Sequence, residues 1–316
     1  MASCQVQGEP ELYGLGIRVA FYIQWFGAIV VEYLEAADLP DIRLLGLLFS
    51  AAALVGLVVR LSVATAAAAA ALQPADVYIV LLLAAGIHVF LVPLYAWKAA
   101  TCFRPYWDPF RWSKETPSPA FKGLSFALLL AVTSLAIWYW CAFVPGNPCA
   151  SAQYGFLFSP VGLGNKGFVA SNAIMHLVIL LACVLVLLLK IGWKVPCWRA
   201  RRKKKRRVSK THIVAVKELK TLSDVAVAAT LTAAVELVVS WNGVSAAVDH
   251  VSDTAQVLPL LVSAGFLVRV LFLHFAGADG GSDSSDDDGD DGWSHSYMTE
   301  SQGGLPPAPP PAHPRG

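Results

Sequence analysis

Mostly apolar residues fill seven long stretches of this chain, and polar residues gather between them. Each stretch contains 21 to 23 residues. An α-helix rises about 1.5 Å per residue, so each stretch is long enough to cross a hydrocarbon layer about 30 Å thick. The pattern therefore predicts an all-α bundle of seven transmembrane helices, which we place at residues 14–35, 43–63, 76–97, 121–143, 170–191, 222–243 and 255–276.

The first two predicted spans are the least regular. The first contains Arg18, Gln24 and Glu32, and the second runs into the alanine tract at residues 66–71. Alanine is the best helix former, so we expect the tract to lengthen the second helix beyond the bilayer. If either stretch does not cross, six spans remain and the amino terminus moves to the opposite side.

Composition favours a membrane location. Hydrophobic residues make up 56% of the chain and charged residues 15%, whereas an ordinary soluble domain contains about 25% charged residues. A soluble fold of this size could not cover so much apolar surface. We therefore expect a multi-pass protein of the plasma membrane or an internal membrane, with the lipid bilayer as its main partner.

Basic residues are concentrated in alternate loops, which predicts the orientation. Of the 24 Lys and Arg residues, 13 fall between Lys190 and Lys220. Because short cytoplasmic loops are enriched in Lys and Arg, residues 1–13 should lie outside and the loop at 192–221 in the cytoplasm. Seven consecutive residues of this loop should also attract anionic headgroups, by about 1 kcal/mol per charge near the surface. They are Arg201, Arg202, Lys203, Lys204, Lys205, Arg206 and Arg207.

The segment from residue 277 to residue 316 is predicted to be a disordered cytoplasmic tail. It is rich in Asp and Ser and then in Pro, and it has no apolar periodicity. Such a composition cannot bury enough apolar surface to offset the entropy of ordering.

Cysteines on the predicted outer side suggest a disulfide. Cys141 lies at the end of the fourth span, Cys149 lies in the loop that follows, and Cys4 lies in the outer amino-terminal segment. A Cys141–Cys149 bond is one candidate in an oxidising compartment, although a sequence alone does not fix connectivity.

Ionisable residues inside the spans form two predicted groups according to depth. Arg18, Arg60 and Glu236 lie in the outer halves of their helices, near Asn242, and could meet there. Ionisable groups at membrane depth are costly, so they are usually paired or functional. This outer cluster could bind a ligand or carry ions, or it could hold the bundle together as ion pairs, and position near an interface favours the ion pairs.

On the inner side, Glu32 and Arg269 are predicted to form a second polar pair. Between the two groups, Gln24 and His88 lie nearest the midplane, where we expect them to form interhelical hydrogen bonds.

Helix packing and bending can also be predicted. The sixth span is rich in alanine, and small residues let helices approach closely in lipid, so this helix should be central. Pro93 in the third span and Pro259 in the seventh should kink their helices.

Motifs for chemistry are missing from the sequence. The glycine pattern at residues 162–167 matches a dinucleotide fingerprint, but no strand precedes it and a membrane span follows it. The predicted seventh helix contains Arg269 and no lysine for retinal, and His274 has no second histidine for a metal site. We expect no enzyme activity, no cofactor, no metal and no binding of nucleic acid.

Two groups of residues carry a family resemblance. The first is Tyr13-Gly14-Leu15-Gly16-Ile17-Arg18 followed by Tyr22 and Gln24-Trp25, and the second is Glu236, Trp241-Asn242, Gln256, Pro259 and Arg269. In these positions the chain resembles a family of uncharacterised multi-pass membrane proteins of filamentous fungi. The resemblance covers the first and the last two spans best, and it implies an all-helical bundle and a fungal source without implying an activity.

Two functions fit these observations. The first is a receptor-like or scaffolding membrane protein whose outer cluster senses a ligand. The alternative is a transporter of small solutes or ions that uses the same charges. Transporters often contain internal repeats, and the two halves of this chain show no convincing similarity, which favours the first.

Overall fold

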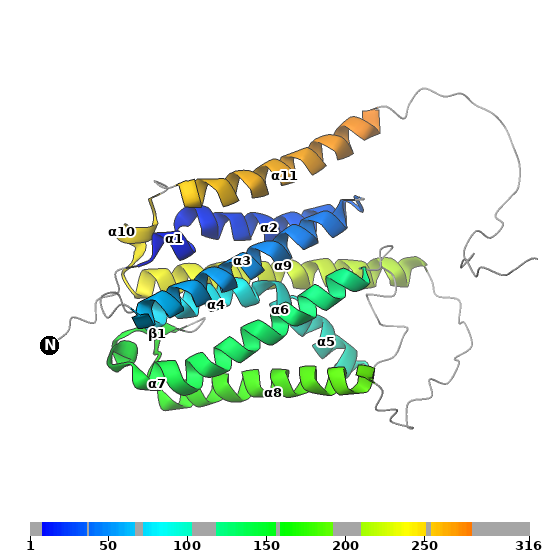
Figure 1. The fold of residues 1–316 in the computed structure, drawn as a ribbon. Coiled ribbons are helices and arrows are strands. Elements are labelled where there is room, and N and C mark those ends of the chain that lie inside the picture. Colours follow the sequence, from blue (N-terminus) through cyan, green and yellow to red (C-terminus); the bar gives the residue numbers. More distant parts are fainter. Residues whose placement is uncertain are drawn as a thin grey trace, which may run out of the picture.

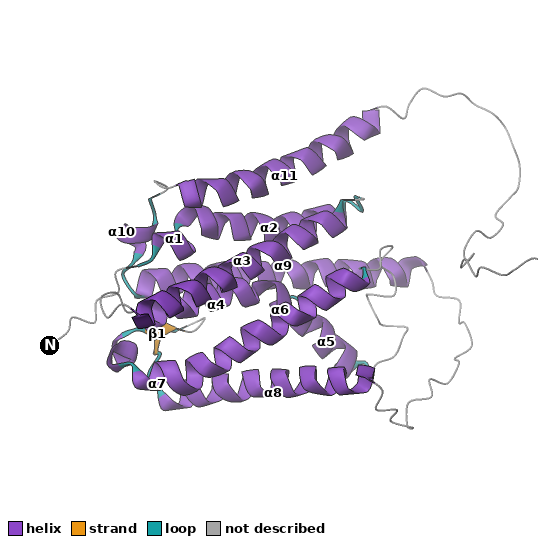
Figure 2. Ribbon diagram, viewed as in Figure 1, coloured by secondary structure: helices purple, strands orange, loops and turns teal. Residues whose placement is uncertain are grey.

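The computed structural model describes residues 8–36, 38–66, 72–102, 118–155, 159–191, 210–250 and 254–279. Within these ranges the structure is helical apart from turns and one small antiparallel sheet (Figures 1 and 2). In this sheet β1 (Tyr154–Gly155) pairs with β2 (Val161–Gly162). The prediction of an all-α bundle is therefore correct.

Six long helices meet the length and hydropathy requirements for crossing a membrane. They are α2 (Leu15–Tyr33), α3 (Leu39–Ala66), α6 (Pro119–Trp138), α8 (Lys166–Ile191), α9 (Lys210–Trp241) and α11 (Thr254–Asp279). The short α1 (Pro10–Tyr13) comes directly before α2. A bent pair, α4 (Pro74–Val89) and α5 (Leu91–Ala100), forms a seventh if it is counted as one span. The chain is a membrane protein with six or seven such helices.

Proline explains the break in the predicted third span. α4 and α5 differ in direction by 45°, and Pro93 lies in the first turn of α5. A proline has no N–H group and its ring clashes with the carbonyl four residues earlier, here that of Val89, the last residue of α4. By contrast, α11 continues through Pro259 without interruption.

Short elements gather at one end of the bundle, which we call the cap end (Figure 1). Here lie α1, the sheet, and four further turns of helix. These are the π-helical turn η3 (Tyr139–Phe143), α7 (Val144–Gly146), the 3-10 turn η4 (Pro148–Ala152) and α10 (Ser245–Val248). The opposite end, where α2 turns into α3 and where α9 begins, is called the far end.

The core is centred on α4, whose neighbours include α3, α6 and α9. α2 packs between α11 on one side and α3 and α9 on the other. α9 packs against both α2 and α4, as the prediction of a central helix requires. However, Ala226, Ala229 and Ala233 are exposed, and the packing uses Ala228, Ala234 and larger residues instead.

α8 and α11 lie at the two edges of the bundle (Figure 1). α8 packs mainly on α6, and α11 packs mainly on α2. Both helices expose large apolar side chains, among them Leu181, Leu185, Leu261 and Phe272. This exposure is expected of helices whose outer faces contact lipid.

Two glycines permit close contacts of α2 with other helices. A Cβ atom at Gly16 would lie 2.4 Å from the backbone oxygen of Gln256 in α11, and one at Gly86 in α4 would lie 2.4 Å from Cζ2 of Trp25. Larger residues cannot fit at either position without moving the neighbouring group.

Candidate functional site

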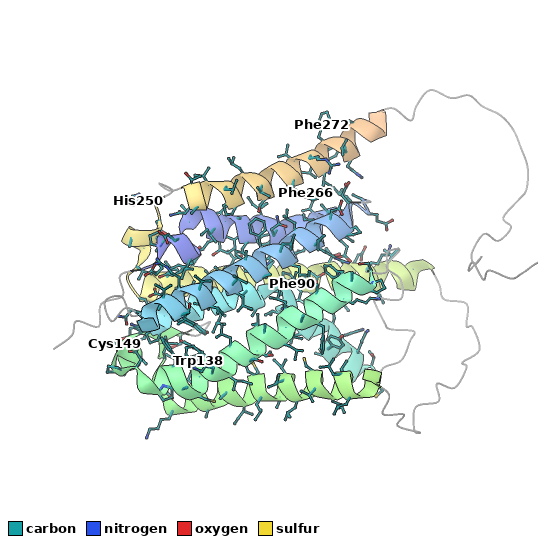
Figure 3. The ribbon with its side chains drawn as sticks, viewed as in Figure 1. Phe90, Trp138, Cys149, His250, Phe266 and Phe272 are labelled. Atoms are coloured by element: carbon teal, nitrogen blue, oxygen red, sulfur yellow. The ribbon has the colours of Figure 1, made fainter. Side chains whose placement is uncertain are left out.

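Arg18 is the centre of an ion cluster at the cap end. Its side chain is completely buried, and its Nη1 atom donates to Oε2 of Glu236 in α9 at 2.5 Å. Its Nη2 atom donates to Oδ1 of Asp249, which follows α10. Tyr22 donates its hydroxyl proton to Oε1 of Glu236 at 2.7 Å. We call these four residues the Arg18 cluster. His250, which follows Asp249 in the chain, is labelled in Figure 3.

Helix geometry explains how the cluster forms. Arg18 and Tyr22 are four residues apart on α2, so their side chains share one face. That face packs against α9, which contributes Glu236 from its last two turns. α10 then turns the chain back over the cap end, which brings Asp249 to the second guanidinium nitrogen. The cluster therefore joins α2, α9 and the segment before α11.

Charge in the cluster is unbalanced. One arginine faces two carboxylates, so the formal charges of the three side chains sum to one negative unit. Arg18 is 0% exposed, whereas the side chains of Glu236 and Asp249 are 44% and 46% exposed. The two carboxylates are therefore accessible at the surface of the bundle, and the guanidinium is not.

Two buried polar groups near the start of α2 have no hydrogen-bond partner within the described part of the chain. One is Nε of Arg18, and the other is the side-chain amide of Gln256, which is completely buried. The Gln256 amide packs where a Cβ of Gly14 would be, one helical turn before Arg18.

Two other residues of the predicted outer cluster lie elsewhere at the cap end. Arg60 binds Glu9 at 2.6 Å and Glu11 at 3.1 Å, because α1 folds back beside α3. Asn242 follows the last residue of α9, where it accepts from the backbone N–H of Tyr154 and donates to its carbonyl at 3.0 Å and 2.8 Å. The structure thus brings Arg18 and Glu236 together, and it places Arg60 and Asn242 outside their cluster.

A second buried network at the cap end was not predicted. The hydroxyl of Tyr13 donates to Oδ1 of Asp76 at 2.5 Å, and Asp76 also accepts from the backbone N–H of Gln73. Gln153 accepts from the N–H of Ala75 and donates to the side chain of Gln73, which ties the loop before β1 to the start of α4. The sequence did contain a signal for part of this network. Asp76 is the third residue of a helix that begins with proline, and acids at this position cap the starts of helices.

The predicted inner pair of Glu32 and Arg269 is wrong. Glu32 lies 2.9 Å from Arg43 and 2.8 Å from Lys220, whereas Arg269 is 3.6 Å from Asp38. The reason is direction around the helix axis, because the Arg269 side chain is 59% exposed on α11 and does not point towards Glu32.

Ion pairs at the far end balance one another. Four basic and four acidic residues form ion pairs there in three separate groups, on α2, α3, α9, α11 and the turn between α2 and α3. The basic residues are Arg43, Lys217, Lys220 and Arg269, and the acidic residues are Glu32, Glu35, Asp38 and Asp224. These ion pairs, unlike the Arg18 cluster, contain equal numbers of basic and acidic side chains.

Polar contacts at intermediate depth are few. Gln24 donates to the hydroxyl of Ser263 in α11 at 3.1 Å, and Nε2 of His88 lies 3.1 Å from the carbonyl oxygen of Ser125 in α6. Both are contacts between helices, as predicted. Around them the core is apolar, with Trp25 and Leu231 among its buried side chains.

The predicted Cys141–Cys149 bond is wrong. Cys141 is an exposed free thiol in η3, whereas Cys149 is disulfide-bonded and buried in η4. The two side chains lie in different environments, that of Cys141 exposed and that of Cys149 buried.

Thiol labelling should distinguish these two cysteines. When the purified, unreduced chain is treated with a maleimide, we expect Cys141 to be modified and Cys149 to be protected until a reductant is added. Peptide mass spectrometry before and after reduction measures both. Modification of Cys149 without reduction, at a rate similar to that of Cys141, would contradict this expectation.

Several predicted features lie outside the described residues. They include the basic run from Arg201 to Arg207 and most of the predicted tail, although α11 reaches Asp279 and so includes its first residues. Among the described residues, no group of three or more His, Cys, Asp or Glu side chains could hold a metal ion.

Comparison of the chain with protein-family models, with curated proteins and with solved structures found no match. A buried guanidinium that holds two exposed carboxylates is suited to binding and to joining helices.

Proposed function

We propose that this chain is a receptor-like or scaffolding membrane protein in which the Arg18 cluster senses a ligand. In this proposal α4 and α5 form one span, so the bundle has seven. The cap end faces the exterior or a lumen, and the basic loop and carboxyl terminus face the cytoplasm. The positions of Lys217 and Lys220 at the far end support this orientation, because basic residues favour the cytoplasmic side.

One observation carries the sensing role. The Arg18 cluster links segments 218 and 231 residues apart in sequence, yet its carboxylates stay accessible at the surface of the bundle. A ligand that binds those carboxylates would change how α2, α9 and α10 hold one another. Because α9 continues from the cluster to the far end, such a change could be transmitted along a single helix.

Direct contact within the cluster favours sensing over transport. An ion path would need accessible polar groups at successive depths, whereas Arg18 and Glu236 touch each other and an apolar layer lies between the two ends.

Transport of small solutes or ions remains the second candidate function. Gln24 and Ser50 favour it, because Oε1 of Gln24 and Oγ of Ser50 are buried within the bundle and lack partners in the described part of the chain.

Glu236→Gln should separate the two functions. If the protein is a sensor, we expect this variant to change the rate of trypsin cleavage in the loop at 192–221 at least about twofold, a shift of roughly 0.4 kcal/mol. Proteoliposomes with either chain should show no solute flux above empty vesicles. Glu11→Gln is the matched control, because Glu11 is an exposed acid of the cap end outside the Arg18 cluster.

Ion or solute flux with the wild-type chain that Glu236→Gln abolishes would favour the transporter. Equal cleavage rates in the wild type and Glu236→Gln would contradict the sensing role.

A further inference from the structure

We propose that Cys149 forms a disulfide bond with Cys4, which joins the amino-terminal segment covalently to η4 at the cap end. The bonded state of Cys149, the free thiols elsewhere and the reach of the chain support this pairing. Such a bond would form whether or not the Arg18 cluster senses a ligand.

Few cysteines are available as the partner of Cys149. The chain contains six cysteines, and Cys149 is disulfide-bonded. Three of the others are free thiols, namely Cys102, Cys141 and Cys183. Within one chain the partner is therefore Cys4 or Cys197, both of which lie outside the described residues.

Distance along α8 excludes Cys197. The start of α8 lies beside η4, since the N–H of Gly164 donates to the carbonyl oxygen of Ala150 at 2.9 Å. From there α8 runs for 26 residues, about 39 Å, to Ile191 at the far end (Figure 1). The six residues from 192 to 197 can span at most about 22 Å. The remaining gap is wider than the roughly 7 Å that a disulfide permits between Cα atoms.

Cys4 belongs to the segment that enters the structure at the cap end. Gly8, the first described residue, packs against α10, because a Cβ on it would lie 3.0 Å from Cγ1 of Val248. Cys4 is four residues earlier, so the intervening chain spans at most about 14 Å. η4, which contains Cys149, lies at the same end of the bundle (Figures 1 and 3).

α1 and η4 are also held against the same part of α4. Tyr13 in α1 binds Asp76 at 2.5 Å, and Gln153, which follows η4, accepts from the N–H of Ala75 at 2.8 Å. Both α1 and η4 contact α4. A bond between Cys4 and Cys149 would thus join two segments that already pack on the start of one helix.

Formation of the bond removes one proton and one electron from each thiol. The electrons pass by thiol–disulfide exchange to the disulfide of a protein thiol oxidoreductase, which leaves as a dithiol. Such oxidants act outside the cell or in a secretory lumen or periplasm, whereas the cytosol keeps thiols reduced. The pairing therefore also predicts that the cap end faces an oxidising compartment.

The test uses the full chain, made in a eukaryotic host, with free thiols blocked by N-ethylmaleimide before purification. Chymotrypsin cleaves after Phe143 and Tyr154, so it separates Cys149 from Cys141. Without reductant, peptide mass spectrometry should find the Cys149 peptide linked to the peptide that contains Cys4. Dithiothreitol should separate the two.

Three results of this mapping would overturn the pairing. They are a link from Cys149 to Cys197, a link between two copies of Cys149, and a Cys149 that is alkylated before reduction. Because the mapping uses the wild-type chain, it decides the pairing even if a variant does not fold.

Cys4→Ser provides a second readout, with Cys197→Ser as its matched control. In denaturant without reductant, Cys149 should be alkylated in Cys4→Ser and stay protected in Cys197→Ser. The melting temperature of Cys4→Ser should fall by at least about 4 °C, because a disulfide that closes a long loop constrains the unfolded chain. Adding Cys149→Ser to Cys4→Ser should lower it no further, since both changes remove one bond. Protection of Cys149 in Cys4→Ser would show that the partner is another residue.

Discussion

Replacing Glu236 and Asp249 together by Gln and Asn should destabilise the protein by about 3–5 kcal/mol, which is the range for breaking a buried charge pair. The double variant leaves the Arg18 guanidinium completely buried and without a charged partner. Each single variant keeps one carboxylate on Arg18 and should therefore lose less than half as much. Reversible unfolding of the purified chain in mixed micelles measures all three.

Adding Arg18→Met to the double variant is the informative control. Replacing a whole buried ion pair by apolar groups is often neutral or stabilising, so the triple variant should recover much of the lost stability. If the double variant loses less than about 1 kcal/mol, the cluster behaves like an exposed ion pair, and the structural role assigned to Arg18 is wrong.

Gly16→Leu should have the second-largest effect, a loss of at least about 1–3 kcal/mol from overpacking. A Cβ at this position would lie 2.4 Å from the backbone oxygen of Gln256 and 2.8 Å from its carbonyl carbon. Backbone within a helix cannot turn aside as a side chain can, so α11 has to move away from α2. Since α2 is the main neighbour of α11, little else would hold this helix in place.

Gly265→Leu is the matched control for Gly16→Leu. Gly265 lies in α11 itself, and a Cβ there would have no atom within 4 Å among the described residues. Its melting temperature should equal or slightly exceed that of the wild type, because leucine is a better helix former than glycine. A similar loss in both variants would show that the close contact at Gly16 is not the cause.

The sequence predicts the helices better than it predicts their ends. Apolar length locates every long helix, because burial in lipid requires it. The end of a helix, however, depends on local backbone hydrogen bonding and not on lipid. α9 is helical from Lys210 instead of residue 222, and in this extension Lys217 and Lys220 form ion pairs with Glu35 and Glu32.

For the polar residues, depth is predictable and direction is not. Arg18 and Glu236 meet because they match in depth and their helices also turn them towards each other. Glu32 and Arg269 do not meet, because their helices do not turn them towards each other. Glu32 faces Lys220, and Arg269 points away from Glu32. Asp249 was missed because it lies in a connecting segment, where neither apolar spacing nor depth applies.

The long sequence separation within the Arg18 cluster also has a consequence for biosynthesis. Glu236 is translated 218 residues after Arg18. At about 5–20 residues per second, a ribosome needs roughly 10–40 s to cover that distance. During this time the first inserted helix has an arginine without its acidic partners, so we expect nascent chains stopped before α9 to depend on insertion chaperones and to be degraded quickly.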